Sequence, residues 1–151
     1  MAIEFLLVVN RQGKLRLSRW YNQLTLSQRQ SLAVDLASLV LSRAPRAPLI
    51  FPHRDLHVVY KRYASLFFIV GIAGQGQESS LLVLDWVHRY VEILDGYFGN
   101  VCELDLIFNY AKAYSIWDDM CVAGVLVETS SRSVISATRL IDDRIKAERL
   151  Q

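Results

Sequence analysis

The stretch from Gly71 to Gly76 is the first place where residue types suggest catalytic chemistry, because glycine-rich loops can bind phosphate groups. It follows a predicted strand and precedes a predicted helix, as a phosphate-binding loop does. Its glycines read G-x-x-G-x-G, the reverse of the dinucleotide-binding order, and no second parallel strand follows the helix. The segment therefore predicts a plain connection, and a small nucleotide-binding enzyme remains only as an alternative.

The other side chains with reactive groups form no catalytic or metal-binding pattern. The histidines have no metal-ligand spacing, and Cys102 has no base partner near it in sequence. The adjacent Asp118 and Asp119 are interpreted as a solvated helix face rather than a catalytic carboxylate pair. Cys102 and Cys121 lie in apolar stretches predicted to be helical, which favours buried, reduced thiols. We expect no enzyme activity, no catalytic residue, no metal and no cofactor.

The chain is more apolar than an isolated domain of its size requires. It has 151 residues, of which 52% are hydrophobic, and its mean hydropathy of +0.21 is high for a globular protein. Charged residues interrupt the apolar runs before the roughly 20 residues of a membrane helix are reached. The surplus apolar surface therefore predicts contact with a partner protein. The net charge of +2 gives no reason to expect nucleic-acid binding.

The first residues show no secretion signal. The sequence begins Met-Ala-Ile-Glu and enters an apolar segment without a basic region or a small-residue cleavage site. We therefore expect the chain to remain in the cytosol, as a single domain over residues 1–151.

Five segments have the composition or alternation of β-strands. Residues 3–9 are apolar at both alternating sets of positions, which is typical of a central strand covered on both faces. Asn10–Gly13 supplies turn residues for a hairpin, and the short Ala64–Ser65 link predicts that the strands beside it pair antiparallel. The predicted strands cover residues 3–9, 15–20, 49–51, 56–63 and 66–72.

Apolar residues at helical spacing predict the remaining elements. The capping-box spacing of Ser27 and Gln30 indicates the start of a first helix, which ends near Ser42 before a proline-containing segment. A second helix, from about residue 80 to 98, carries two apolar stripes and is expected to bury two sides; Leu82 belongs to one stripe.

The third helix is predicted over residues 107–121, with Gly124 as its C-cap, and a last helix after Thr129 and Ser130. This order of elements predicts an α+β domain with one five-stranded, mainly antiparallel sheet sandwiched by helices.

Four blocks of sequence resemble the small (sigma) chains of clathrin-associated adaptor complexes. They are residues 10–21 (NRQGKLRLSRWY), 59–68 (VYKRYASLFF), 88–95 (HRYVEILD) and 97–109 (YFGNVCELDLIFN). The resemblance extends from about residue 3 to 141 and implies the longin-like (SNARE-like) fold, in agreement with the predicted order of elements. Within the family, Lys61–Ser65, His88–Tyr90 and Lys112–Tyr114 favour the Golgi/endosome type with a gamma chain.

The resemblance also implies partners and a location. Family members work in a heterotetramer, in direct contact with a large chain of the gamma or alpha type and together with beta and medium chains. The resemblance therefore implies vesicle-mediated protein transport, with the chain held by its complex on the cytoplasmic side of Golgi and endosomal coated-vesicle membranes. An obligate interface would account for the surplus apolar surface.

Family members recognise acidic dileucine signals, [Asp/Glu]-x-x-x-Leu-[Leu/Ile], in the tails of cargo proteins. Such a signal requires an apolar pocket for two leucine-sized side chains and a cation for the acidic residue. By the resemblance, Arg16 on the second strand meets the acidic residue. The implied pocket residues are Ala64, Leu66 and Phe68 on a strand, Val91 on the second predicted helix, and Asn100, Val101, Leu104 and Leu106 after it.

Simpler interpretations remain open at this point. The apolar members of this set are residues that any core contains, Asn100 can cap its own helix, and Arg16 can be a solvated surface charge. Other basic residues, including Lys61, could instead meet an acidic partner surface. A longin-type subunit of another trafficking complex, for tethering or fusion, is the alternative function.

Overall fold

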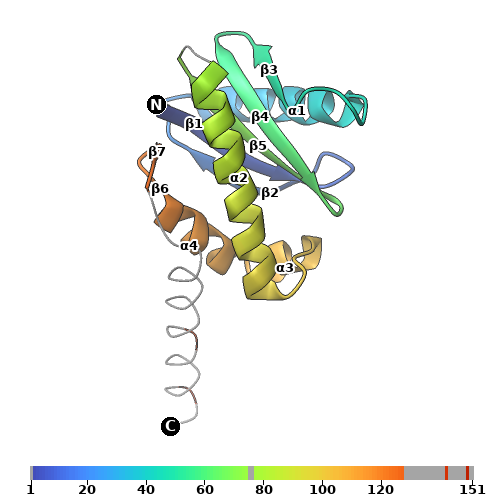
Figure 1. The fold of residues 1–151 in the computed structure, drawn as a ribbon, viewed down its shortest axis with the longest axis vertical. Coiled ribbons are helices and arrows are strands. Elements are labelled where there is room, and N and C mark those ends of the chain that lie inside the picture. The colour runs from blue at the N-terminus through green and yellow to red at the C-terminus, as the bar shows by residue number, and fades with distance from the viewer. Residues whose placement is uncertain (1, 75–76, 128–141, 143–148, 150–151) are drawn as a thin grey trace.

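The computed structural model describes residues 2–74 and 77–127 together with residues 142 and 149 (Figure 1). The last predicted helix, after Thr129, lies almost entirely outside the described residues. The strands are β1 (Ala2–Val9), β2 (Leu15–Trp20), β3 (Ile50–His53), β4 (Leu56–Tyr63), β5 (Leu66–Ala73), β6 (Cys121–Val122) and β7 (Val125–Leu126). The helices are α1 (Leu26–Ser42), α2 (Gln77–Phe98), α3 (Glu103–Phe108) and α4 (Tyr110–Met120).

The first five strands form one sheet in the order β2-β1-β5-β4-β3, and each neighbouring pair is antiparallel. β1 is an interior strand of the sheet, because it pairs with β2 on one side and with β5 on the other. Ala64 and Ser65 connect β4 directly to its antiparallel neighbour β5. The predicted five-stranded α+β fold is therefore confirmed.

Helices cover both faces of this sheet, with α1 behind it and α2 in front of it in Figure 1. Alternating residues of β1 divide between the two faces: Phe5 and Leu7 pack with the buried face of α1, and Leu6 and Val8 pack with α2 and α4. Because a strand's side chains alternate between faces, a strand buried on both sides must be apolar throughout. The prediction of a doubly covered central strand is confirmed.

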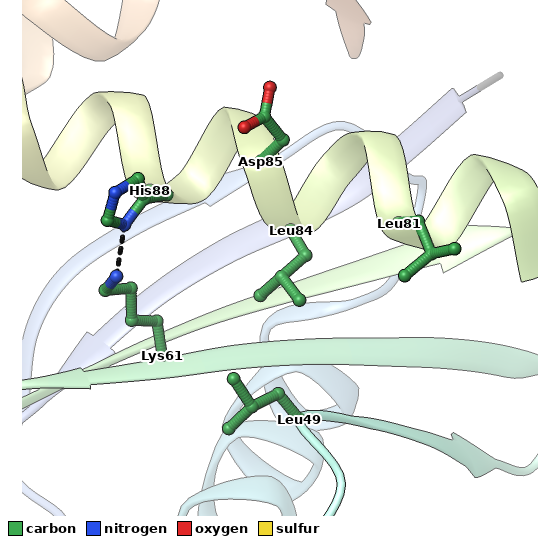
Figure 2. A pocket seen from close by; sticks show the side chains of 6 residues that line it. All are labelled: Leu49, Lys61, Leu81, Leu84, Asp85 and His88. Carbon is green, nitrogen blue, oxygen red and sulfur yellow. Dashed lines mark hydrogen bonds between the residues drawn. The ribbon is translucent and has the colours of Figure 1, made fainter.

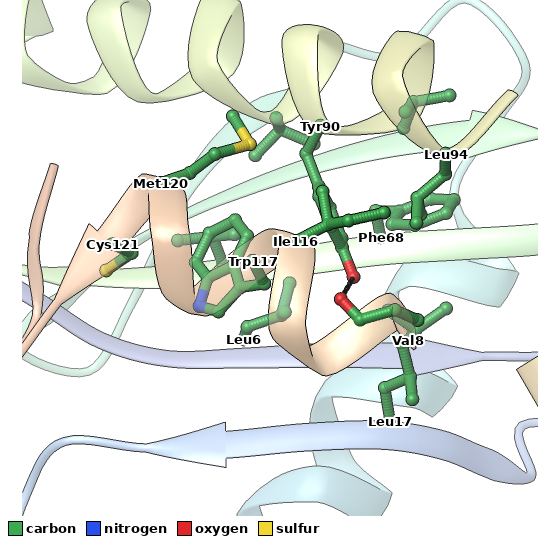
Figure 3. Close-up of a cluster of buried hydrophobic side chains, with 14 of the residues drawn as sticks. Leu6, Val8, Leu17, Phe68, Tyr90, Leu94, Ile116, Trp117, Met120 and Cys121 are labelled. Carbon is green, nitrogen blue, oxygen red and sulfur yellow. Dashed lines mark hydrogen bonds between the residues drawn. The ribbon is translucent and has the colours of Figure 1, made fainter. Parts of the chain in front are cut away.

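The second predicted helix buries two sides, as its two stripes indicated. α2 contacts β4 and β5 on one side and α4 on the other. Between α2 and α4, Tyr90 and Trp117 meet edge to face with ring centroids 5.1 Å apart, and the Tyr90 hydroxyl donates to the Ala113 carbonyl oxygen at 2.8 Å (Figure 3). Leu82 is an exception to the predicted stripe, since it is 59% exposed near the start of α2.

The start of α1 differs from the prediction. Thr25 is the N-cap: its side-chain oxygen accepts from the Gln28 backbone N–H at 3.2 Å, and the Gln28 side chain accepts from the Thr25 backbone N–H at 2.9 Å. The capping box is therefore Thr25–Gln28 and not Ser27–Gln30. Both pairs have the required spacing, and the chain uses the earlier one.

Gly124 was predicted to be a helix C-cap, but it is part of a small hairpin. Residues 103–120 form two helices, α3 and α4, and Ala123 and Gly124 connect β6 to β7 with φ of 52° and 82°. Positive φ at both central residues is typical of a two-residue hairpin turn. The Ile3 N–H donates to the Gly124 carbonyl oxygen at 2.8 Å, so this hairpin is fixed to the start of β1.

Gly71, the first residue of the glycine-rich segment, is required by packing within the sheet. It lies opposite Phe5 in the pairing of β1 with β5. A Cβ atom at Gly71 would lie 2.3 Å from Phe5 Cζ, which is too close for any carbon contact. This glycine thus makes room for a buried aromatic ring.

Candidate functional site

The residues implied as a dileucine pocket fall into a buried group and an exposed group. Five belong to one contiguous buried cluster and are at most 2% exposed: Leu66, Phe68, Val91, Val101 and Leu106. The other three, Ala64, Asn100 and Leu104, are exposed. Leu104 is the largest of these, with 60% of its surface exposed. In the isolated chain, Leu104 therefore offers a ligand a large surface, whereas the buried five offer almost none.

Ala64 was expected on a strand, but it lies in the turn between β4 and β5. Its φ is 54°, in the left-handed region that residues other than glycine rarely adopt.

A carboxylate that the sequence analysis missed, Asp95, joins this turn to the end of α2. Its Oδ1 atom accepts from the Tyr63 hydroxyl at 2.5 Å and from the Val101 backbone N–H at 3.0 Å. Gly99 and Asn100 then end α2 in left-handed conformations, with their N–H groups donating to the Asp95 carbonyl oxygen at 2.9 and 3.1 Å. Asp95 thereby ties the end of β4 to the segment that carries Asn100 and Val101.

Arg16, the predicted cation for an acidic ligand, is paired within its own chain. Its Nε and Nη2 atoms both lie 2.7 Å from Glu103 Oε1. The same oxygen accepts from Asn10 Nδ2 at 2.8 Å. Asn10 is buried, and its side-chain oxygen accepts from the backbone N–H groups of Gln12 and Lys14, both at 2.9 Å.

This network fixes the charge of Glu103. The hydrogen bonds from Asn10 and Arg16 stabilise the carboxylate and lower the pKa of Glu103 from its ordinary value. The sequence gives only a weak signal for its role, an acidic residue in the first turn of α3. The partners lie in a hairpin far away in sequence, so the pairing was missed.

A hollow of about 370 Å³ lies beside Arg16. Its lining consists of apolar and aromatic residues together with the guanidinium: Leu15, Arg16, Leu106, Ile107, Tyr110 and Tyr114. Leu104, Phe108 and Tyr110 of the adjoining helices α3 and α4 are also well exposed. The hollow is thus lined by apolar and aromatic side chains with the guanidinium of Arg16 at its side, which suits an amphipathic ligand.

A second hollow, of about 340 Å³, lies between α2 and the edge of the sheet (Figure 2). Leucines form its walls, and Lys61 Nζ donates to His88 Nδ1 at one end. His88 Nε2 in turn lies 2.8 Å from Glu92 Oε1. Lys61, which the sequence left as a candidate for an acidic partner, therefore makes its hydrogen bond to a neighbouring side chain.

Two further expectations are corrected by the structure. Asp118 is not only a solvated carboxylate, because it accepts two hydrogen bonds from Arg19. Arg19 Nε donates to Oδ1 at 3.0 Å, and Arg19 Nη2 donates to Oδ2 at 2.7 Å. Cys102 is exposed at the N-cap of α3, and only Cys121 is buried, where burial raises the pKa of its thiol.

Neither a metal cluster nor a membrane span is found in the part of the chain that the structure describes. Its histidines, cysteines and carboxylates form no group of three able to hold a metal ion, and none of its helices is long and apolar enough to cross a bilayer. The five-stranded antiparallel sheet, covered by helices on both faces, is the longin-like fold.

Comparison with known proteins places this domain in a family. The family model described as "Clathrin adaptor complex small chain" matches residues 2–144. The chain is 44% identical over 151 residues to AP-1 complex subunit sigma-1 of Schizosaccharomyces pombe, which covers 100% of this chain and 92% of that protein. It is 46% identical over 140 residues to human AP-1 complex subunit sigma-1A, covering 93% and 87%.

Similar values hold for AP-1 complex subunit sigma-3 of Mus musculus, with 48% identity over 135 residues, 89% of this chain and 86% of that protein. A chain of a structure described as a homology model of the full-length AP-3 complex in a stretched open conformation matches with a TM-score of 0.74. It has 25% identity and covers 97% of both chains. The chain belongs to the clathrin adaptor complex small chain family, which is not a known enzyme family.

Proposed function

We propose that this chain is the small subunit of a heterotetrameric clathrin adaptor complex of the gamma-containing type. In this role it contacts the large chain directly and works with a beta and a medium chain in vesicle transport at Golgi and endosomal membranes. The support is the full-length similarity to sigma subunits of AP-1 complexes. The described helices also carry exposed apolar side chains, which a partner chain could cover in such an assembly.

Assembly is tested by affinity purification of the tagged chain from cytosol. We expect a gamma- or alpha-type large chain to co-purify in equal amounts, because an obligate interface keeps its partners together through washing. Recovery of the tagged chain from cytosol without any large chain would contradict the proposal.

Within the complex, the chain contributes to recognition of acidic dileucine signals. The observation that supports this role is the position of Arg16 beside an apolar hollow that Leu106 also lines. Burying two leucine side chains supplies about 3–6 kcal/mol before the cost of ordering the peptide, which suits reversible binding. Leu104, Asn100 and Ala64 are the accessible members of the proposed site, and the buried five form the apolar cluster to which it belongs.

Because Leu104 is exposed, its replacement tests this site without disturbing the core. In the assembled complex, Leu104→Asp is expected to weaken binding of a Glu-x-x-x-Leu-Leu peptide by about tenfold or more, since it places a charge against an apolar ligand. Arg16→Ser is expected to cost less, about two- to fivefold, because a partly exposed ion pair contributes at most about 1 kcal/mol. Isothermal titration calorimetry measures both effects.

Val34→Asp is the matched control. Val34 is 68% exposed on α1, on the other side of the sheet, so this variant introduces the same charge away from the proposed site. Unchanged peptide binding by Leu104→Asp, or an equal loss in Val34→Asp, would remove the site assignment.

A further inference from the structure

Arg16 has an acidic partner before any ligand arrives. Glu103 Oε1 contacts the Nε and Nη2 atoms, which together form one edge of the guanidinium. Nη1 is not part of this contact and belongs to the other edge, which has the geometry to receive a second carboxylate. A ligand's acidic residue therefore meets an arginine whose charge is already balanced by Glu103.

Asn10 holds Glu103 in this position independently of Arg16. The Asn10 amide nitrogen donates to Glu103 Oε1 at 2.8 Å, while the amide oxygen is fixed by two backbone N–H groups of the β1–β2 turn. Glu103 is thus anchored by a buried neutral side chain. A carboxylate held in this way cannot swing away at low cost when a second carboxylate approaches Arg16.

The Arg16–Glu103 pair is also partly buried, so a ligand carboxylate would compete with Glu103 for Arg16 at a site that is not fully solvated. The side chains of Arg16 and Glu103 are 19% and 27% exposed, so solvent screens their charges less than at a fully exposed site. Like charges that share one cation repel each other, and this repulsion opposes the attraction that Arg16 exerts on the ligand.

We propose that Glu103 is a specificity-determining residue of the cargo site, which balances the charge of Arg16 and so limits the preference for an acidic residue before the leucines. This inference rests on the proposed dileucine function. Glu103 thereby reduces the advantage of an acidic signal over a neutral one, because it already balances part of the charge of Arg16.

The test compares two peptides, Glu-x-x-x-Leu-Leu and Gln-x-x-x-Leu-Leu, on the assembled complex carrying Glu103→Gln. The glutamine oxygen can still accept from Asn10 and Arg16, so the variant removes the charge and keeps the geometry. We expect the ratio of the two dissociation constants, neutral over acidic, to rise about two- to fivefold, the range of one partly exposed ion pair. Glu103→Ala, which removes charge and acceptor together, is expected to raise the ratio as well.

Asp118→Asn is the matched control, because it removes the carboxylate from the other arginine pair of β2, Arg19 with Asp118. It changes the net charge by the same amount, yet the ratio is expected to stay at its wild-type value. An unchanged or lower ratio in both Glu103 variants, or an equal rise in Asp118→Asn, overturns the inference.

The same measurements separate this inference from the proposed function. If Leu104→Asp and Arg16→Ser leave the binding of both peptides unchanged, the proposed site is wrong and the role of Glu103 falls with it. If those variants weaken binding while the Glu103 variants leave the ratio unchanged, only the role of Glu103 is wrong.

Discussion

Val91→Asp is expected to destabilise the domain by about 3–5 kcal/mol, because it would place an unpaired carboxylate in an apolar core. Val91 is 2% exposed on α2 and belongs to the cluster that packs against the sheet and α4. Domains of this size have about 5–15 kcal/mol of total stability, so the substitution would remove a large part of it. Urea unfolding of the full-length chain, followed by circular dichroism, measures the change.

Val34→Asp is the control for this prediction as well, since an exposed substitution is expected to change stability by no more than about 0.5 kcal/mol. If Val91→Asp unfolds at the same urea concentration as the wild type, α2 does not hold Val91 in the core. The expected loss of stability also explains why Leu104 is the better position for testing cargo binding.

Trp117→Ala is expected to have an effect of similar size, about 3–5 kcal/mol, because it removes the largest buried side chain of α4. The indole lies between α2, α4 and the sheet, against Tyr90 (Figure 3). Its Nε1 atom donates to the Tyr21 hydroxyl at 2.8 Å. Burial of Tyr21 raises the pKa of its hydroxyl, which therefore stays protonated and loses a donor partner when the indole is removed.

Trp117→Phe separates these two contributions. It keeps most of the ring volume and loses the hydrogen bond, so we expect a loss of only about 1–2 kcal/mol relative to the wild type. Equal losses in the alanine and phenylalanine variants would show that the hydrogen bond, and not the packing, dominates at this position. The same unfolding measurement distinguishes the two results.

Most of the fold could be predicted because local periodicity reflects burial. The continuous apolar run of β1 indicated cover on both faces, and the two stripes of α2 indicated two buried sides; both predictions are confirmed. The failures occur where two local solutions are equally good. Thr25–Gln28 and Ser27–Gln30 both have capping-box spacing, and Gly124 suits a helix end as well as a hairpin turn.

The candidate site was less accessible to sequence reasoning. The resemblance named Leu66, Val91 and Leu104 in the same way, whereas the structure buries the first two and exposes the third. A hydrophobic residue has the same signature in a core and in a pocket, because burial statistics do not register which neighbour covers it. The role of these residues in cargo binding stays a prediction.

The sequence by itself determined which segments become strands and helices and which faces they bury, since those properties depend on residues only a few positions apart. Only the tertiary structure decided the partners of the charges. Arg16 and Glu103 lie 87 positions apart, and Asn10 and Glu103 lie 93 apart. Contacts at such separations form only after the hairpin and α3 have been placed by the packing of the whole core, so no local pattern encodes them.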